Sequence, residues 1–592
     1  MRLLGTASVL ASSLAVLFSG TEAEACGGTF CDAGPNLDVV DQAAETVVFV
    51  RDGAYVEAHI QIAIDPNTDA QKFAWLLPMP AVPEFQVGSQ PLFDALLSNT
   101  TPLFGTNGPY CGAGDEGGGF IQDPDGSGAS VDPEVQTTSV GAFEVTVLQG
   151  GTVDGVMTWL GDNGYEQDPA AAPILDSYLA DGHVLVAFRL LPSADVGEVH
   201  PIVLRYLGDE PCVPLRLTAI AAKDDMAVRV FMLGDERWAP LNYQHVVPNP
   251  LRFRWSYSGP EYADVITQAV DAAEGGHGFV TEYAGDSALI DDSALWAATW
   301  DADAFVAAAA IDVVHLLNDQ QLANCTRNGP CFVGHPVVVG MLRKYLPAPA
   351  DVAENDFYRC LSCYADQTDF PLWDGPAFAN EMRDRVIAPG LHAKDLLGAW
   401  PYLTRMFTTI SPHEMTLDPT FQPAPDLREV GNVSVATVEC VECDADLDAI
   451  ATLADGRQVY LDDATWPAFD AGMPYAERIE DIPPKGAPIV VVDNRPLIDD
   501  ALDAWNDAHE CMPPDGTADT GTGGPGGPGG TGGSGIPGDD GGTSGGTQGS
   551  DGTAENADTL GRGCSCDAGA PLDPRGGFAA LMLLALRRRR RA

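Results

Sequence analysis

The sequence predicts an α+β fold in which a β-rich N-terminal region, a helical middle region and a small β-rich C-terminal region follow one another. Between about 26 and 258, apolar and polar residues alternate with the two-residue period of strands. Between about 259 and 425, apolar residues recur every three or four positions, as on one face of a helix, and strand patterns return between about 426 and 511. The chain has 592 residues, 45% of them hydrophobic, which suffices for two or more domains with packed cores.

The first 25 residues have the three parts of a secretory signal peptide. Arg2 supplies the positive charge, residues 3–18 are mostly apolar, and residues 23–25 (AEA) form a cleavage site of the small-x-small type. The signal predicts export and a mature chain that begins at Cys26. Lipidation of Cys26 is one interpretation, but the residues before it form a weak lipidation motif, so a disulfide at Cys26 is favoured.

A hairpin opens the β-rich region at 26–258. In "TVVFVRDGAYVEAHIQIAI", Asp52-Gly53 supplies the positive φ angles that a tight turn needs. In the second arm, apolar residues alternate with Glu57, His59 and Gln61, so we expect these three on a solvated strand face. The later segment "FAWLLPMP" has two interpretations, core and turn or a ligand-binding segment, and the first is favoured.

A Gly/Asp-rich stretch at about 108–135 interrupts the strands and is predicted to be a long loop. Poly-glycine precedes its acidic part and Pro133 interrupts it, whereas a calcium-binding loop has flanking helices. A plain linker is therefore favoured over a calcium site, and no other cofactor is expected. The side chains that match the calcium-loop spacing are Asp123, Asp125, Ser127 and Glu134.

The helical region at 259–425 is clearest in "DADAFVAAAAIDVVHLLNDQ", which predicts a helix over 301–320. Val306, Ala310, Val313 and Leu317 share one face of that helix at spacings of three and four residues. This face would pack against a core.

Thirteen cysteines in an exported chain predict disulfides. Eleven of them precede the low-complexity tail, so at least one is unpaired or modified, and the connectivity does not follow from the sequence. Two Cys-x-x-Cys pairs also allow a zinc site, but 76 residues separate them, so disulfides are favoured. The candidate disulfide cysteines are Cys26, Cys31, Cys325, Cys331, Cys360, Cys363, Cys440 and Cys443.

The chain is strongly acidic, with 85 acidic against 31 basic residues and a formal net charge of -54. A field of this sign repels phosphate backbones and disfavours nucleic acid as a partner. A solvated acidic surface is the favoured explanation, and general binding of divalent cations is the alternative.

No motif identifies a catalytic residue. The folded part has no serine-hydrolase elbow, the chain has no phosphate-binding P-loop, and none of its ten histidines has the metalloprotease spacing. His245, in "NYQHV", and His277, in "GGHGF", are the first histidines to mutate, with no role assigned. Whether the protein is an enzyme is left open, with a non-enzymatic function favoured.

The C-terminal part is a predicted tether followed by a sorting signal. Residues 512–562 are nearly all Gly, Thr, Asp, Pro and Ser, a composition typical of a flexible, disordered linker. In the segment 563–592, nine apolar residues from Phe578 to Leu586 precede five arginines, Arg587 to Arg591. Nine residues are too few for a membrane span, which needs roughly 20, but a short apolar run before an arginine cluster can hold the tail at the cytoplasmic face.

This end of the chain resembles the MYXO-CTERM sorting tag of myxobacteria and their relatives. The resemblance rests on Gly563-Cys564-Ser565-Cys566, the short apolar run and the arginine cluster. It implies cleavage near the cysteine by a membrane-embedded sorting protease and attachment to the cell envelope through Cys564 or, alternatively, Cys566.

The body of the chain resembles an uncharacterised bacterial family, number 2330 among the domains of unknown function. The segments that carry the resemblance lie within about 26–435 and are "CGGTFC", "FAWLLPMPAVPEF", "CVPLRLTAIAA", "VFMLGDERWAPLNYQHV", "GFVTEYAG" and "LTRMFTTISPHEMTLDPTF". The family has no assigned reaction, so the resemblance implies no catalytic residue.

These patterns together predict a secreted protein that is anchored at the cell surface, associated with the outer membrane after both ends are removed. The favoured function is a binding or structural protein of the envelope, with an unknown ligand. The alternative is a surface-attached hydrolase whose site is assembled from residues far apart in the sequence.

Overall fold

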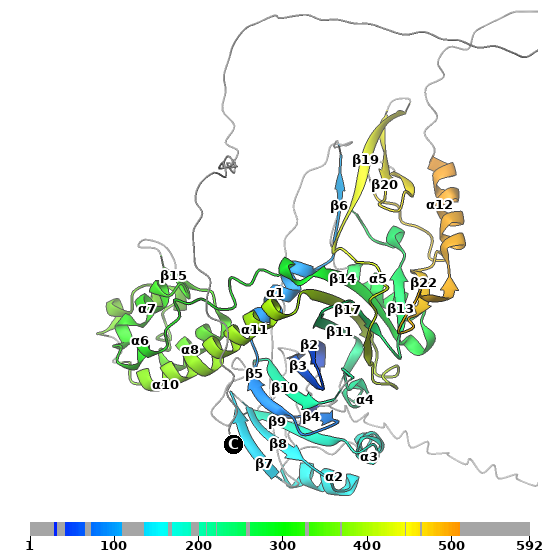
Figure 1. Cartoon of the computed structure of the whole chain (residues 1–592). Helices are drawn as coiled ribbons and strands as arrows, with labels where there is room; N and C mark the ends of the chain where they lie inside the picture. Colours follow the sequence, from blue (N-terminus) through cyan, green and yellow to red (C-terminus); the bar gives the residue numbers. More distant parts are fainter. Residues whose placement is uncertain are drawn as a thin grey trace, which may run out of the picture. The chain divides into compact units, whose positions relative to one another are not determined.

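A ten-stranded sheet is the largest element of the computed structural model (Figure 1). Its strand order is β23-β22-β13-β14-β17-β11-β2-β3-β10-β5, and only the β2–β11 and β13–β14 pairs are parallel. The strands are β2 (Gln42–Asp52), β3 (Tyr55–Ile64), β5 (Glu84–Val87), β10 (Ile202–Leu207), β11 (Ala222–Gly234), β13 (Gln244–Pro248), β14 (Gly278–Asp286), β17 (Tyr402–Ile410), β22 (Ala476–Asp481) and β23 (Ile489–Asp493). All three predicted regions therefore contribute strands to one sheet.

The structure describes most of the chain between residues 29 and 509. Helices and strands are mixed, with a strand-rich N-terminal region, which confirms the predicted α+β class. The described ranges are 29–31, 42–64, 73–108, 135–141, 143–163, 169–190, 200–208, 210–220, 222–255, 261–325, 331–366, 370–443, 446–461 and 465–509.

The predicted hairpin is confirmed at β2 and β3. The two strands pair antiparallel, Asp52 lies opposite Tyr55, and Gly53 has φ 62° in the turn. Glycine adopts this left-handed conformation without steric cost. The alternation of side chains along β3 therefore follows the predicted register.

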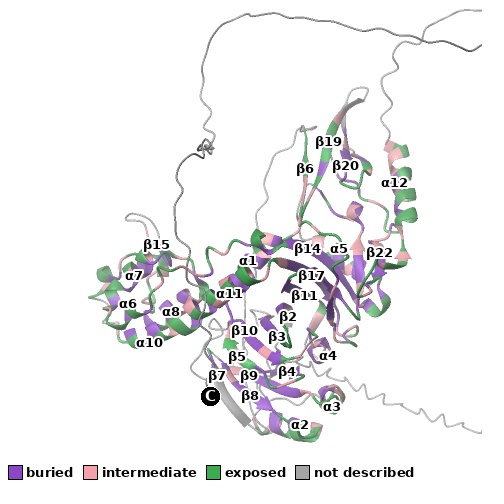
Figure 2. Ribbon diagram, in the orientation of Figure 1, coloured by how far each residue is buried: buried purple, intermediate pink, exposed green. Residues whose placement is uncertain are grey.

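Both faces of the central part of the sheet are covered, so its strands are apolar on both sides. Val47 and Phe49 of β2 belong to the core shared with the five-stranded sheet. Val48 and Val50 point to the other face, where they pack with helices α1 (Gln90–Thr100) and α11 (Ala388–Ala399). Figure 2 shows the resulting band of buried residues along β2, β11 and β17.

The five-stranded sheet packs on the first face and carries helices on its outer side. Its order is β1-β4-β9-β8-β7, and Trp75, Val145 and Phe188 point into the shared core. Its opposite face packs against α2 (Val153–Asp162) and α3 (Ala171–Ala180). The strands are β1 (Thr29–Cys31), β4 (Phe73–Met79), β7 (Val135–Val140), β8 (Phe143–Leu148) and β9 (Val184–Leu190).

A helical cluster with its own apolar core occupies residues 302–387. A π-helical turn, Met382–Ile387, joins its last helix to α11. The elements of the cluster are α6 (Asp303–Val306), α7 (Val313–Asp319), β15 (Ala323–Cys325), β16 (Cys331–Val333), α8 (Pro336–Tyr345), α9 (Glu354–Arg359) and α10 (Gly375–Glu381).

The remaining short elements lie outside this cluster. They are α4 (Leu215–Thr218), the pair β12 (Trp238–Pro240) with β18 (Phe421–Pro423), and helix α5 (Glu261–Val270), which packs on β13, β14 and β22.

The single helix predicted over 301–320 is wrong. The chain forms α6, a 3-10 turn and α7 instead, and Val306 is 44% exposed. Tertiary contacts explain the break, because the Trp373 indole N–H donates to the Ala308 carbonyl oxygen at 2.9 Å and Gly375 packs against the carbonyl oxygens of Phe305 and Val306. Such contacts outweigh the helix propensity of the alanine run.

The C-terminal part of the described chain is a four-stranded sheet covered by α12 (Arg495–His509). Its strands, in the order β21-β20-β19-β6, are β6 (Leu103–Asn107), β19 (Val433–Cys443), β20 (Asp446–Thr452) and β21 (Gln458–Leu461). Ile498 and Leu502 of α12 are buried against it. Among the described residues, no helix has the length and apolar character needed to cross a membrane.

Several predictions fall on residues outside the described ranges. These are the signal peptide, the calcium-loop residues Asp123, Asp125, Ser127 and Glu134, the tether, the tag with Cys564 and Cys566, and Cys26. They stay predictions.

Candidate ligand pocket

A cavity of about 310 Å³ lies between the ten-stranded sheet and the five-stranded sheet. Alternate residues of β2 and β3 form one wall, among them Phe49, Ala58 and Ile60. Leu77 and Met79 of β4 form part of the opposite wall. Ligand sites in proteins are mostly apolar cavities of this size or larger with a few polar groups, and this cavity fits that description.

One end of the cavity carries a hydrogen-bonded group around Asp418. The Tyr178 hydroxyl of α3 donates to Asp418 Oδ2 at 2.6 Å, and the backbone N–H of Arg216 donates to Oδ1 at 2.9 Å. Burial raises the pKa of Asp418 against the lowering effect of these two bonds. Burial, with the charge of Asp418, also raises the pKa of Tyr178 well above its usual range, so this hydroxyl keeps its proton.

Backbone pairing holds Asp418 in place. Cys212 forms an isolated antiparallel bridge with Thr420, and the Val213 N–H donates to the Pro419 carbonyl oxygen at 3.1 Å. Asn242 adds two bonds, because its side-chain amide donates to the Asp418 carbonyl oxygen at 2.7 Å and its Oδ1 accepts from the Thr420 N–H at 2.8 Å. A loop tied at several points holds its carboxylate in one position, as a binding site requires.

Cys212 lines the same end of the cavity as a free, half-buried thiol. Burial raises the pKa of this thiol far above its usual value, and the negative charges of Asp418 and Glu210 raise it further. In the described part of the chain, no histidine hydrogen-bonds to it. The only histidine in the lining, His183, lies with Nδ1 3.2 Å from the Tyr178 carbonyl oxygen. A protonated thiol without a base is a poor nucleophile.

Carboxylates line the cavity, and one cation lies close to it, because the Arg216 guanidinium is 5.0 Å from the centre of the Tyr178 ring. Glu45, Glu210 and Asp418 are in the lining, and no lysine or arginine is among the lining residues. An anionic ligand would meet repulsion in these surroundings, whereas an ammonium or hydrogen-bond-donating group would find acceptors.

The segment "FAWLLPMP" contributes both to the core and to the wall of the cavity, while its role in ligand binding stays a prediction. Trp75, Leu77 and Met79 are buried in the core between the sheets, in agreement with the favoured interpretation of the segment as core. Leu77, Pro78, Met79 and Pro80 also line the cavity. The two interpretations do not exclude each other, because a cavity inside a core has core residues as its wall.

The cysteine predictions are borne out for two pairs. Cys325–Cys331 and Cys360–Cys363 are disulfides. Cys440 is also disulfide-bonded, while the side chains of Cys31 and Cys443 lie outside the described residues. Oxidised Cys360 and Cys363 cannot ligate zinc, which requires thiolates.

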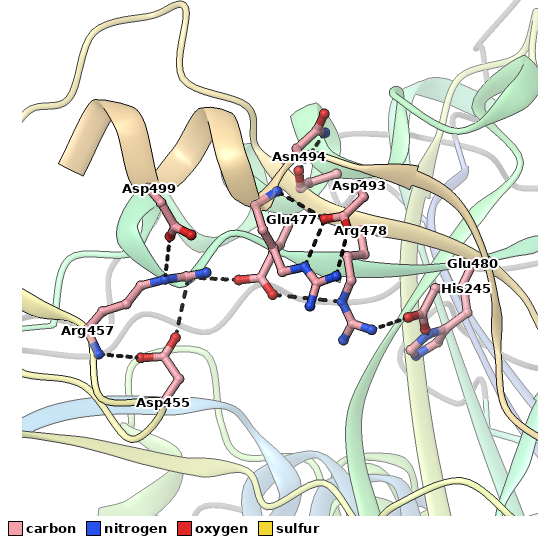
Figure 3. Close-up of polar contacts among 11 residues, drawn as sticks. His245, Asp455, Arg457, Glu477, Arg478, Glu480, Asp493, Asn494 and Asp499 are labelled. Atoms are coloured by element: carbon pink, nitrogen blue, oxygen red, sulfur yellow. Dashed lines mark hydrogen bonds and ion pairs between the residues drawn. The ribbon is translucent and has the colours of Figure 1, made fainter. Parts of the chain in front are cut away.

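His245 is part of a buried polar network rather than of the cavity. Its Nδ1 lies 3.2 Å from Glu480 Oε2 and its Nε2 lies 3.1 Å from Thr281 Oγ1. Burial lowers the pKa of His245, although the bond with Glu480 opposes the shift. Glu480 in turn pairs with Arg478 (Figure 3). The network joins β13, β14 and β22, which indicates a structural role for His245.

The network continues to the surface through ion pairs that tie the C-terminal elements together (Figure 3). Glu477 lies 3.8 Å from Arg478 and 2.8 Å from Arg457. Arg457 also contacts Asp455 at 3.3 Å and, on α12, Asp499 at 3.2 Å. These partly exposed pairs position α12 but form no enclosed site.

His277 holds a turn beside the cavity. Its Nε2 lies 2.8 Å from the Glu414 carbonyl oxygen and 3.1 Å from Thr416 Oγ1. Its ring also lies 4.7 Å from that of Tyr243, whose hydroxyl donates to the Leu417 carbonyl oxygen at 2.7 Å. His277 therefore supports the loop that carries Asp418 without lining the cavity.

The prediction of a solvated strand face at Glu57 and His59 is wrong. Glu57 is 7% exposed and His59 is 1% exposed. Helix α11 covers this face of β3, and the Nε2 atom of His392 on that helix lies 2.7 Å from Glu57 Oε1. The period-two pattern assigned the three polar residues to one face correctly, but it carries no information about a helix more than 300 residues away that covers it.

Sequence reasoning did not select Tyr178, Asp418 or Glu45. Asp418 is one of 85 acidic residues, and nothing in its neighbourhood in sequence distinguishes it. Only the pairing of residues 212–213 with 419–421 brings it to the cavity.

The family model described as "Uncharacterized protein conserved in bacteria (DUF2330)" matches residues 21–320, about half of the chain. The matched range contains Tyr178 and Cys212, whereas Asp418 lies beyond it. Neither a curated protein nor a solved structure matches the chain.

Proposed function

Because the chain belongs to the DUF2330 family of uncharacterised bacterial proteins, which has no assigned reaction, we propose its function from its own cavity. The protein is a binding protein for a small, mostly apolar molecule with a positively charged or hydrogen-bond-donating end. The observation that carries the proposal is the cavity of about 310 Å³ between the two sheets, with Asp418 and Tyr178 at one end.

The lining explains how such a molecule would bind. Burial of its apolar part against residues such as Phe49, Ile60 and Leu77 supplies free energy in proportion to the area removed from water, roughly 25 cal/mol per Å². The carboxylate of Asp418 attracts a donor or cation, and a bond to a charged group contributes about 1.5–3 kcal/mol. Apolar contacts would thus supply affinity and the acidic end would set orientation.

A hydrolase gains no support from the described residues of the cavity. Cys212 keeps its proton, and Tyr178 is committed to Asp418. Nucleophilic catalysis needs a nucleophile with a base in hydrogen-bond reach, which this lining does not supply. Binding is therefore the function that the geometry supports best.

The proposal is tested by calorimetric titration of the mature chain with n-octylammonium and with n-octanol at pH 7. We expect octylammonium to bind more tightly than octanol, because only the ammonium group pairs with the acidic end. Asp418→Asn should weaken octylammonium binding at least about tenfold, equivalent to about 1.4 kcal/mol, and change octanol binding much less.

Two controls make the result specific. Asp395→Asn changes an exposed carboxylate on α11 and should leave both affinities unchanged. Ala58→Phe places a phenyl ring in the cavity from the β3 wall and should abolish binding of both compounds. Circular dichroism checks that this variant is folded. Binding of neither compound to the original chain, or equal binding to folded Ala58→Phe, would refute the pocket.

We further propose that the protein works at the cell surface after both ends are removed. The support is the signal-peptide pattern of residues 1–25 and the resemblance of residues 563–592 to a sorting tag. Mass spectrometry of protein released from the envelope should find peptides up to the tether and none from Phe578 onward. An intact Arg587–Arg591 segment on surface protein would contradict this processing.

A further inference from the structure

A cluster of two histidines and one glutamate lies on the face of β3 that points away from the cavity. Glu57 and His59 are two positions apart on β3, so their side chains share this face, while Ala58 and Ile60 face the cavity. His392 reaches them from α11. These three residues, the His–Glu–His cluster, take no part in the proposed binding function.

The three side chains converge on one point. Glu57 Oε1 lies 2.9 Å from His59 Nε2 and 2.7 Å from His392 Nε2. One possible ligand atom from each residue lies within 4.8 Å of the other two. The two imidazole rings are nearly parallel, 13° apart with centroids separated by 5.6 Å, so both present the same edge to the carboxylate.

Two of these separations are close to those of neighbouring ligand atoms around a metal ion. Metal–nitrogen and metal–oxygen bonds of about 2.0–2.2 Å place neighbouring ligand atoms about 2.9 Å apart at right angles and about 3.3 Å apart in a tetrahedron. The two contacts of Glu57 Oε1, 2.9 and 2.7 Å, are close to the right-angled spacing, and the two imidazole nitrogens lie within 4.8 Å of each other, so the side chains would move apart or together to accommodate an ion.

Hydrogen bonds to Glu57 join the three side chains but leave one buried nitrogen atom of the cluster without a partner among the described residues. His59 is 1% exposed, and its Nδ1 has no hydrogen-bond partner there. The neighbours of His59 on the adjacent strands are apolar, with Val48 of β2 and Val203 of β10 opposite it, whereas Glu57 lies between Val50 and Arg205. Burying an imidazole between aliphatic side chains costs free energy that an apolar side chain would avoid.

We propose that Glu57, His59 and His392 bind a divalent first-row transition metal ion such as zinc. Two imidazoles with one carboxylate form a donor set suited to zinc, iron, nickel or copper, whereas calcium and magnesium take oxygen ligands. Three protein ligands leave at least one coordination position open, as in catalytic rather than structural zinc sites. The site differs from the calcium loop predicted from the sequence in its residues, its ligands and its metal.

The site is accessible from one side. The side chain of His392 is 32% exposed, while those of Glu57 and His59 are 9% and 1% exposed. An ion would therefore enter past α11, with the β3 ligands as its buried base. Arg205 lies 3.9 Å from Glu57 Oε2 and 3.2 Å from Asp52, so it is placed to orient the oxygen that does not face the histidines.

The test is titration of the full mature chain, stripped with EDTA, with Zn²⁺ by calorimetry and with Co²⁺ by visible absorption. We use about 0.3 M salt so that weak binding to the acidic surface is screened. We expect one tight site per chain and a Co²⁺ spectrum typical of nitrogen ligation. His392→Ala should weaken Zn²⁺ binding at least about tenfold and abolish the Co²⁺ bands.

The matched control is His315→Ala, which removes an exposed histidine from helix α7. Its affinity and spectrum should equal those of the original chain. Equal binding by folded His392→Ala would overturn the proposal. If His392→Ala does not fold, an anomalous difference map of Zn²⁺-soaked crystals decides instead. A peak about 2.0–2.2 Å from the Glu57 carboxylate and both imidazoles supports the site, and its absence there overturns it. Loss of octylammonium binding would not affect either outcome.

Discussion

The free energy of unfolding should fall by about 3 kcal/mol for each of His200 and His335 when the pH is lowered from above 7 to 4. Both side chains are buried, and burial lowers the pKa of each to about 4; the charge of Arg385 adds to the shift at His200. Unfolding restores a pKa near 6.5, so the unfolded chain binds protons that the folded chain does not. A difference of about 2.5 pKa units, at 1.36 kcal/mol each, gives the expected size.

The sign follows from which state takes up the proton. Above pH 6.5 both states are neutral at these histidines and no stability is lost. As the pH falls through the unfolded value of 6.5 toward the folded value of about 4, protonation favours the unfolded state progressively. The window in which stability is lost is therefore pH 6.5 to 4.

His335→Leu isolates this effect in urea unfolding at several pH values. His335 caps α8 without a side-chain hydrogen bond to the helix, and its Nδ1 has no partner among the described residues. When the pH is lowered from 7 to 4, the free energy of unfolding of the variant should fall by about 3 kcal/mol less than that of the original chain. His315→Leu, at an exposed position, should show no such gain. If the free energies of unfolding of the original chain and of His335→Leu change with pH in parallel, the prediction is contradicted.

Arg405→Met should lower the free energy of unfolding by about 3–5 kcal/mol at pH 7. Arg405 pairs with Glu282, and their side chains are 5% and 1% exposed. The substitution leaves Glu282 as a buried charge whose remaining hydrogen bond among the described residues comes from the Tyr262 hydroxyl at 2.7 Å, with the charge of Arg229 nearby. It also removes the bond from Arg405 to Thr100 Oγ1 at 3.0 Å, which ties α1 to the sheet.

Two further variants separate loss of the pair from loss of side-chain packing. Arg405→Met with Glu282→Met removes both charges and should regain much of the stability, because Glu282 no longer stays buried without its partner Arg405. Arg343→Met breaks an exposed pair with Glu354 and should cost less than about 1 kcal/mol. A cost for Arg405→Met no larger than that of Arg343→Met, measured by urea unfolding, would show that the buried pair does not stabilise the fold.

Local features were the predictable part of this fold. The β2–β3 hairpin, with Gly53 in its turn one position after the predicted start, and the disulfides Cys325–Cys331 and Cys360–Cys363 depend on residues close in sequence, where spacing and φ preferences are informative. The helix predicted over 301–320 failed because its carbonyl groups meet Trp373 and Gly375, about 70 residues away.

The cavity could not be predicted because its parts are far apart in the chain. Leu77, Tyr178, Cys212 and Asp418 meet only through the packing of two sheets and the pairing of residues 212–213 with 419–421. Each of them is an ordinary residue in its own segment, and sheet partners that are distant in sequence leave no periodic signal.

The sequence by itself determined the α+β class, the alternation along β3 and the chemical character of the chain, because these depend on local periodicity and composition. Only the tertiary structure decided which faces are covered. The alternation places Glu57 and His59 on one side of the strand. The same alternating pattern occurs whether water or a helix lies over that side. Since α11 covers it, two polar residues expected in solvent are buried beside His392 as a candidate metal site.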